Sequence, residues 1–215
     1  TDVRNVASAC VKLSVVIPTC ALGTTPRLSS GKQPYAFRVY LLRCFTLPLL
    51  HHDPLVGEII VVGEFEAGVG YTYVPCPNVR FDNIHDALAQ RQAGFEAASG
   101  DELLYLADDH VLGPHALSRL TKYRVLGDVV SLNRRTRMRV GTGEDLNCGM
   151  ADGYANGHGC LYRRAVLATC PWSAAPRTFV YDVGHSAQIK AAGFNLVYAP
   201  DAYVEDVEAG ATPWA

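Results

Sequence analysis

The sequence predicts an α/β domain with a largely parallel central sheet flanked by helices. Short apolar runs rich in Val, Ile and Leu alternate along the chain with segments of helical periodicity. Most of these runs are apolar throughout, as expected for strands covered on both faces. The chain has 215 residues, of which 49% are hydrophobic, which is enough to bury the core of one domain. We expect a single domain over residues 1–215, alone or as one domain of a longer protein.

The predicted strands are short and end in polar or glycine-rich segments. The first is "VKLSVVIPT" at residues 11–19, a β-rich apolar run with a proline near its end. The second is "GEIIVVG", and "ELLYLA" follows later in the chain. The full set of expected strands is 11–19, 57–63, 79–81, 102–107, 128–133 and 195–199.

Helical periodicity predicts four helices between these strands. The first should end at Pro48, because proline lacks the N–H that a helix interior needs. Its apolar positions are Phe37, Leu41, Leu42 and Phe45. The four helices are expected at 35–47, 83–102, 114–126 and 182–194, with a short regular segment at 161–170. Residues 20–34 and 134–159 are rich in polar residues and glycine and are expected to be irregular.

Charge and cysteine usage exclude several classes of protein. The formal net charge is −2, and no basic stripe runs along the chain, so we expect no nucleic-acid partner. No segment reaches the roughly 18 apolar residues of a transmembrane span, and no signal peptide is recognisable. The seven cysteines form no CxxC pair, which favours reduced thiols and a cytoplasmic location.

Polar residues follow three of the predicted strands. Thr19 ends the first, Glu64 follows the second, and Asp108, Asp109 and His110 follow the strand that ends at Ala107. Ligands of open α/β sheets bind beyond the carboxyl ends of parallel strands. We therefore expect these side chains to share one edge of the sheet.

The adjacent carboxylates of Asp108 and Asp109 predict a bound cation. Two ionised carboxylates repel each other at a strand end unless a positive charge lies between them. A hard divalent cation is a natural partner, and one that also holds phosphates commonly takes only one or two protein carboxylates. A solvated turn or helix cap before Pro114 is an alternative. A nuclease-type metal site is another, which the lack of a basic stripe disfavours.

Several motifs stand in a fixed order: "LSVVIPT", then "EIIVVG", then "LAQRQAGFEAASGDELLYLADDHVLGPHAL". Together they resemble the nucleotide-binding half of GT-A-fold glycosyltransferases, specifically glycosyltransferase family 2. The resemblance covers residues 13–120, and "FVYDVGHSAQIKAAGFNLVYAPDAYVED" at 179–206 resembles a second family segment. It implies a Rossmann-like GT-A fold with a mixed, mostly parallel sheet. Residues 11–133 would bind the nucleotide sugar, and 134–215 would form the acceptor-binding and catalytic half.

The resemblance also implies roles for individual residues. Thr19 and Arg91 stand where the family contacts the nucleotide, and Glu64 stands near the family's nucleobase-binding Asp. Asp108 would face the ribose or the metal.

The resemblance implies a Mn²⁺ or Mg²⁺ site and a general base. Asp109 and Asp108 would bind the metal as an "ADDH" variant of the DxD motif, in which Ala107 replaces the first carboxylate. His110 and Asp206 are further candidate ligands. Asp182 would take the proton from the acceptor hydroxyl, although Tyr181 replaces the glutamate that precedes this position in the family.

Other polar residues have weaker functional interpretations. Arg134–Arg139 could bind phosphates, but such a run is more often a solvated edge strand. Residues 153–159 are either a flexible wall of the acceptor pocket, with His158 reaching the donor phosphates or the metal, or a plain glycine-rich turn. We expect His185 at the surface and Cys160 in the core.

The predicted function is a metal-dependent, inverting glycosyltransferase of the hexosyltransferase type. It would move a sugar from a nucleotide-diphosphate sugar, preferably a UDP-sugar, to a hydroxyl of a glycan, glycoprotein or other glycoconjugate. One alternative is a sugar-phosphate nucleotidyltransferase, suggested by "GTTPRL" at 23–28. Another is a non-catalytic module that binds sugar nucleotides or glycans, suggested by Ala107 and Tyr181.

Overall fold

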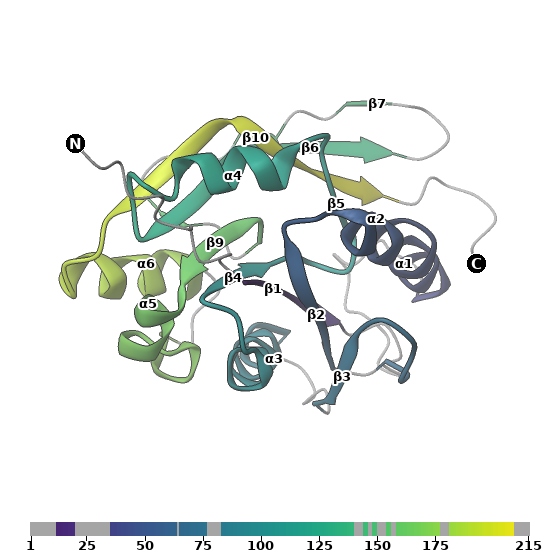
Figure 1. The fold of residues 1–215 in the computed structure, drawn as a ribbon, viewed down its shortest axis with the longest axis horizontal. Helices are drawn as coiled ribbons and strands as arrows, with labels where there is room; N and C mark the ends of the chain where they lie inside the picture. The colour runs from purple at the N-terminus through teal and green to yellow at the C-terminus, as the bar shows by residue number, and fades with distance from the viewer. Residues whose placement is uncertain are drawn as a thin grey trace, which may run out of the picture.

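A mixed β-sheet forms the centre of the molecule in the computed structural model (Figure 1). The structure describes residues 12–19, 35–63, 65–76, 83–139, 144–145, 148–149, 154–155, 158–176 and 181–208. Eight strands follow one another across the sheet in the order β3-β2-β1-β4-β9-β6-β10-β5. Two further short strands, β7 and β8, pair with β6. The strands are β1 Leu13–Thr19, β2 Val56–Gly63, β3 Thr72–Pro75, β4 Glu102–Tyr105, β5 His110–Leu112, β6 Val129–Arg139, β7 Glu144–Asp145, β8 Cys148–Gly149, β9 Cys160–Arg163 and β10 Leu196–Glu208.

Most strands of the main path run in the same direction. The pairs β3–β2, β2–β1, β1–β4 and β6–β10 are parallel. β9 is antiparallel to both β4 and β6, and β5 is antiparallel to β10. The chain moves outward from β1 to β2 and β3 and then returns to place β4 on the other side of β1. The reversal point between β1 and β4 is where ligands of open α/β sheets bind.

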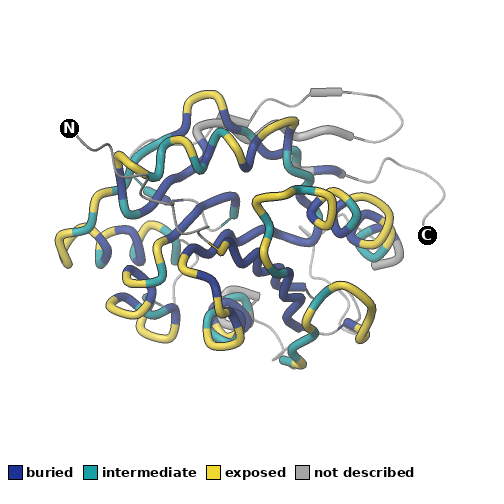
Figure 2. Tube along the Cα trace, viewed as in Figure 1, coloured by how far each residue is buried: buried dark blue, intermediate teal, exposed yellow. Residues whose placement is uncertain are grey.

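Helices cover both faces of the sheet (Figure 1). Leu13, Val15 and Ile17 of β1 belong to one hydrophobic cluster, with residues of α2 and α4. Val16, between them, belongs to the opposite cluster, with residues of α3, α5 and α6. The central strands are accordingly buried along their length, as the dark blue tube shows (Figure 2). The helices are α1 Tyr35–Leu41, α2 Leu47–His52, α3 Asn83–Ala97, α4 Ala116–Tyr123, α5 Arg164–Thr169 and α6 Tyr181–Ala191, with a π-helix η1 Leu42–Thr46 and a 3-10 helix η2 Trp172–Ala174.

The first helical segment differs from its prediction. The helix does not end at Pro48, because α1 continues through the π-helix η1 into α2, and Pro48 lies in the first turn of α2. Proline removes one hydrogen bond from a helix, and the π-helical turn directly before Pro48, in which the Leu47 N–H donates to Leu42 O, already interrupts the regular α-helical pattern there. Phe45 is 44% exposed and not on the buried face.

The strands also differ from the prediction in extent. β6 continues through Arg139, although 134–159 was expected to be irregular, and β10 continues to Glu208. Each supplies the backbone partners of the other over this extension. Over Arg134–Arg139, β6 pairs with β10 on one side and with the short strands β7 and β8 on the other, so this segment is not the expected edge strand. The expected strand at 79–81 and the loop 20–34 lie outside the described residues.

We predict that Gly94→Ala destabilises the domain although alanine favours helices. A methyl group at this position of α3 would lie 2.2 Å from Val16 Cγ1 of β1. Overpacking of this kind costs about 1–3 kcal/mol, which exceeds the gain of about 1 kcal/mol in helix propensity. Urea denaturation should show a lower free energy of unfolding. Glu96→Ala, at an exposed position of the same helix, is the control and should change it by less than about 0.5 kcal/mol. Equal stability of Gly94→Ala and the wild type would contradict this packing.

Candidate functional site

The candidate site lies where β1 and β4 end side by side. The two strands pair in parallel up to Val16 and Tyr105, and the Leu106 N–H continues the ladder to Val16 O at 3.0 Å. Thr19 is the last residue of β1, and Asp108 follows β4 by three residues. The sequence-based expectation that these two positions share one edge agrees with this arrangement.

Asp108 and Asp109 are held together by a guanidinium. Arg38 of α1 donates from Nη1 to Asp108 Oδ1 and from Nη2 to Asp109 Oδ2. Thr19 Oγ1 donates to the other oxygen of Asp108 at 2.9 Å. Asp108 is only 2% exposed, so the repulsion between the carboxylates would be strong without this cation. A positive charge does lie between the two acids, and it belongs to the protein.

Two histidines lie beyond the acid pair. His110 is buried, with Nδ1 at 3.6 Å from Asp109 Oδ1. Its ring centroid is 5.1 Å from that of His158. His158 Nδ1 in turn lies 3.1 Å from Arg91 Nη2. A guanidinium can only donate, so Nδ1 must accept, and the proton of a neutral His158 is on Nε2.

Arg91 is a fully buried cation. Its exposure is 0%, and its guanidinium carbon lies over three aromatic rings, at 4.9 Å from the centroid of Trp172, 5.2 Å from that of Tyr105 and 5.5 Å from that of Tyr181. Among the described residues, its Nε and Nη1 have no hydrogen-bond partner. Contacts with aromatic faces offset part of the desolvation cost of such a charge. Arg91 reaches the rest of the site through its contact with His158.

Asp182 lies in the first turn of α6, beside this aromatic cage. Its Oδ1 accepts the Val183 N–H at 3.1 Å, and its preceding residue, Tyr181, supplies one ring of the cage. An acidic residue is favourable at a helix N-terminus because of the helix dipole. Burial raises the pKa of the nearby Cys160 thiol to about 12, with Asp182 adding to the effect and Arg91 opposing it. Cys160 is therefore a core residue, as expected.

The structure brings most of the predicted site residues into one connected cluster. Thr19, Asp108, Asp109, His110, His158 and Arg91 follow one another through the contacts described above. Asp206 joins through the backbone, because it is the register partner of His110 between β10 and β5. Glu64 lies outside the described residues.

Arg38 is the residue of this cluster that the sequence analysis missed. It lies three and four residues before Leu41 and Leu42, both buried. A cation at a position of the apolar stripe of a helix was the signal that could have identified it.

The acid pair has the donor chemistry of a divalent-cation site. In the described part of the chain, no three His, Cys, Asp or Glu side chains are grouped as a metal site. A cation shared with a diphosphate needs only one or two protein carboxylates, so Asp108 and Asp109 fit that role. Arg38 occupies one oxygen of each acid, so a cation bound by both acids would compete with it.

His185 is buried, contrary to the expected surface position. It is 1% exposed, and its ring centroid lies 3.9 Å from that of Trp172. Its Nε2 is 2.8 Å from Cys170 O. The helix α6 turns this residue toward the sheet, together with Ser186 and Ile189. Burial lowers the pKa of His185 to about 4, and the hydrogen bond to Cys170 opposes that shift.

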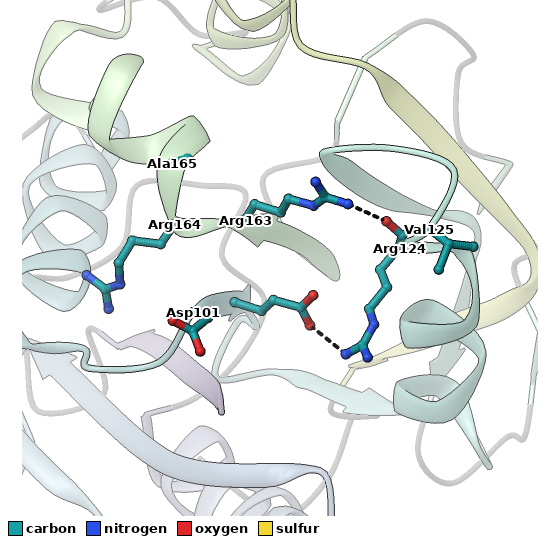
Figure 3. A pocket seen from close by; sticks show the side chains of 7 residues that line it. Asp101, Arg124, Val125, Arg163, Arg164 and Ala165 are labelled. Atoms are coloured by element: carbon teal, nitrogen blue, oxygen red, sulfur yellow. Dashed lines mark hydrogen bonds and ion pairs between the residues drawn. The ribbon is translucent and has the colours of Figure 1, made fainter. Parts of the chain in front are cut away.

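A hollow at the opposite end of β4 is separate from this cluster (Figure 3). Its lining includes three arginines, whose guanidinium groups already have partners in the protein. Arg124 Nη1 lies 3.5 Å from Glu102 Oε2, and Arg163 Nη2 donates to Arg124 O at 3.0 Å. Arg164 donates from Nε to Gly100 O at 2.7 Å and from Nη2 to Ala98 O at 2.6 Å. These arginines brace the amino end of β4 and are not our candidate site.

Comparisons with known proteins give a likeness in structure alone. No protein-family model and no curated protein matches the sequence. Among solved structures, TarS of S. aureus superposes on 92% of this chain with a TM-score of 0.57 at 14% identity. GalNAc-T7, solved with UDP, GalNAc and Mn²⁺, superposes on 93% with a TM-score of 0.58 at 12% identity. The domain has a GT-A fold. Membership of glycosyltransferase family 2 stays a prediction.

The likeness extends to other proteins and covers only part of each. The bifunctional IspDF of Campylobacter jejuni superposes on 88% of this chain with a TM-score of 0.54 at 13% identity. This chain spans 37% of the TarS chain, 44% of GalNAc-T7 and 49% of IspDF. Among the described residues, no helix is long and apolar enough to cross a bilayer.

We predict that Arg91→Met changes the tautomer of His158. Methionine fills a similar volume but cannot donate to Nδ1, so the proton should distribute between both ring nitrogens. Long-range ¹H–¹⁵N spectra of histidine-labelled protein report the protonated nitrogen directly. His185 is the internal control, because the carbonyl of Cys170 keeps its proton on Nε2 in both proteins. An unchanged His158 spectrum would contradict the proposed contact.

We predict that His185 makes the domain less stable in acid. The unfolded chain takes up a proton near pH 6.5, whereas the folded chain does so only near pH 4. The contribution of His185 to the free energy of unfolding is therefore fully present above about pH 6.5. It falls by about 1.4 kcal/mol per pH unit between pH 6.5 and pH 4. His185→Gln keeps a donor for Cys170 O but does not titrate. The stability advantage of the wild type over this variant should shrink by about 2 kcal/mol from pH 7 to pH 5 in urea denaturation. If the free energies of unfolding of the wild type and His185→Gln change in parallel with pH, the folded protein does not hold the His185 ring neutral.

Proposed function

We propose that this domain is an inverting, metal-dependent glycosyltransferase that uses a nucleotide-diphosphate sugar, preferably a UDP-sugar. The observation that carries the proposal is the cluster at the reversal point between β1 and β4, where Thr19, Asp108 and Asp109 converge. GalNAc-T7 and TarS, glycosyltransferases of the same fold, support this class of reaction. The acceptor would be a hydroxyl of a glycan, glycoprotein or other glycoconjugate.

The donor would bind at the carboxyl edge of the sheet. Residues 11–133 would hold the nucleotide, with Thr19 and Glu64 among its contacts and Asp108 facing the ribose or the metal. Asp109 and Asp108 would hold a Mn²⁺ or Mg²⁺ ion, with His110 and Asp206 as further candidate ligands. When bound, this ion would offset the negative charge that develops on the leaving diphosphate. His158, held by Arg91 with its proton on Nε2, is suited to donate a hydrogen bond to that diphosphate.

Residues 134–215 would hold the acceptor and the general base. Asp182 is half-buried at the start of α6 and lies next to Tyr181, which contacts Arg91. It would accept the proton of the acceptor hydroxyl while the oxygen forms its bond to the anomeric carbon. The bond from that carbon to the diphosphate oxygen would break on the opposite face, so the configuration would invert.

A screen of NDP-sugars tests the proposed donor class. Ligands that bind only the folded state raise the melting temperature, so UDP- and other NDP-sugars should do so in the presence of Mn²⁺. Sugar transfer to a panel of glycan acceptors and hydrolysis of the donor are then measured in the same samples. The proposal is wrong if no NDP-sugar binds with or without Mn²⁺.

We predict that Asp182→Asn binds the donor as the wild type does but transfers the sugar about 10²- to 10⁴-fold more slowly, because the amide cannot accept the proton. Nucleoside diphosphate release measures the rate, and the thermal shift measures donor binding. The control is Asp201→Asn, at an exposed position of β10. Turnover of Asp182→Asn at the wild-type rate would remove the base assignment. A wild type as inert as the variant would favour a non-catalytic binding module.

The second candidate function is a sugar-phosphate nucleotidyltransferase. It is favoured by the structural likeness to IspDF, a nucleotidyltransferase neighbour. Such an enzyme would transfer the nucleotidyl group of a nucleoside triphosphate to a sugar phosphate. The β- and γ-phosphates of the triphosphate would leave as pyrophosphate. Pyrophosphate release in that assay, without sugar transfer from NDP-sugars, distinguishes it from the leading proposal.

A further inference from the structure

Arg38 holds one oxygen of each carboxylate of the acid pair. Asp108 Oδ2 accepts from Thr19, and Asp109 Oδ1 faces His110. Asp108 Oδ1 and Asp109 Oδ2 are both held by the guanidinium. The guanidinium of Arg38 therefore already occupies the position between Asp108 Oδ1 and Asp109 Oδ2.

Burial makes this arrangement a strong one. The side chains of Arg38, Asp108 and Asp109 are only 13%, 3% and 14% exposed. Charge pairs screened so little by water interact much more strongly than surface pairs, and loss of one partner of a buried pair is costly. One guanidinium nevertheless carries a single charge against two carboxylates, so the cluster of three groups keeps a net charge of −1.

The helix that carries Arg38 is fixed, while its guanidinium is at the end of a long side chain. Phe37 and Leu41 of α1 are buried against Val207 of β10, with Val111 of β5 packed beside them. Thr46 Oγ1 of η1 also donates to His110 O at 3.4 Å. The backbone of α1 therefore stays beside the acid pair when the Arg38 side chain changes rotamer.

We propose that Arg38 is the resident counter-ion of the acid pair, and that it exchanges with a divalent cation by transferring its guanidinium to the diphosphate of the nucleotide. A divalent ion neutralises both carboxylates and releases Arg38, and a diphosphate supplies a new bidentate acceptor for it. Arg38 is thus a positioning residue that keeps the cation site closed until cation and nucleotide bind together. This inference rests on the proposed donor class, but its main test uses the metal alone.

The test compares Mn²⁺ binding to metal-free wild type and Arg38→Gln, measured from the EPR signal of free Mn²⁺ without nucleotide. Glutamine carries no charge, so the variant should bind Mn²⁺ at least about tenfold more tightly than the wild type. Arg38→Lys keeps one charge but cannot hold both carboxylates, and its affinity should lie between the two. Arg43→Gln is the control, because Arg43 is an exposed arginine of η1 that pairs with Glu66 outside the site. Its affinity should equal that of the wild type.

Two further measurements keep the inference testable if Arg38→Gln is unstable. Mn²⁺ should raise the melting temperature of Arg38→Gln more than that of the wild type, because it restores the missing positive charge. UDP should tighten Mn²⁺ binding by a larger factor in the wild type than in Arg38→Gln, since only the wild type must move the guanidinium.

Several outcomes would overturn the exchange. One is Mn²⁺ binding by Arg38→Gln that is equal to or weaker than that of the wild type. Another is the absence of Mn²⁺ binding by either protein. The first outcome leaves the proposed transferase unaffected. The second, with an NDP-sugar still bound and cleaved without added metal, would keep the transferase but remove its metal dependence. Failure of every NDP-sugar to bind, with tight Mn²⁺ binding by Arg38→Gln, would instead reject the donor class and leave the competition between Arg38 and the cation in place.

Discussion

The repulsion between the carboxylates of Asp108 and Asp109, at the end of the buried strand β4, is the constraint on which the rest of the site depends. Groups from separate parts of the chain offset it. Thr19 at the end of β1 donates a hydrogen bond, and Arg38 of α1 bridges both acids. Asp108 is only 2% exposed, so water can offset little of this repulsion. The positions of α1 and β1 relative to β4 are therefore part of the chemistry of the site.

The second buried cation of the site, Arg91, is stabilised in a different way. Its partners are the faces of Tyr105, Trp172 and Tyr181 and a nitrogen of His158. Aromatic faces and an imidazole nitrogen stabilise a cation less than a carboxylate does, so Arg91 keeps more of its positive potential. Positive groups at both ends of the cluster suit an anionic ligand such as a diphosphate.

Two antiparallel strands of the main path, β9 and β5, allow late segments of the chain to reach the end of β4. β9 pairs with β4, and the Gly159 N–H donates to Tyr105 O, which places His158 beside the site. β5 pairs with β10 and places Asp206 opposite His110. The Val207 N–H also donates to Asp109 O at 3.0 Å. A purely parallel sheet would leave these segments at other edges, so the mixed topology is what completes the cluster.

The sequence by itself determined the strands β1, β2 and β4, because apolar runs that must be buried on both faces are a local signal. It also placed Thr19 and the acid pair at one edge of the sheet, because strand direction follows from the alternation of strands and helices. The extension of β6 and β10 and the existence of β5 depend on pairing between residues far apart in the sequence, which composition does not encode. For the same reason only the tertiary structure decided that Arg38 bridges the acids and that His185 is buried on Trp172. Both residues are polar and lie on helices. The strands against which these helices pack decide the surroundings of the two side chains.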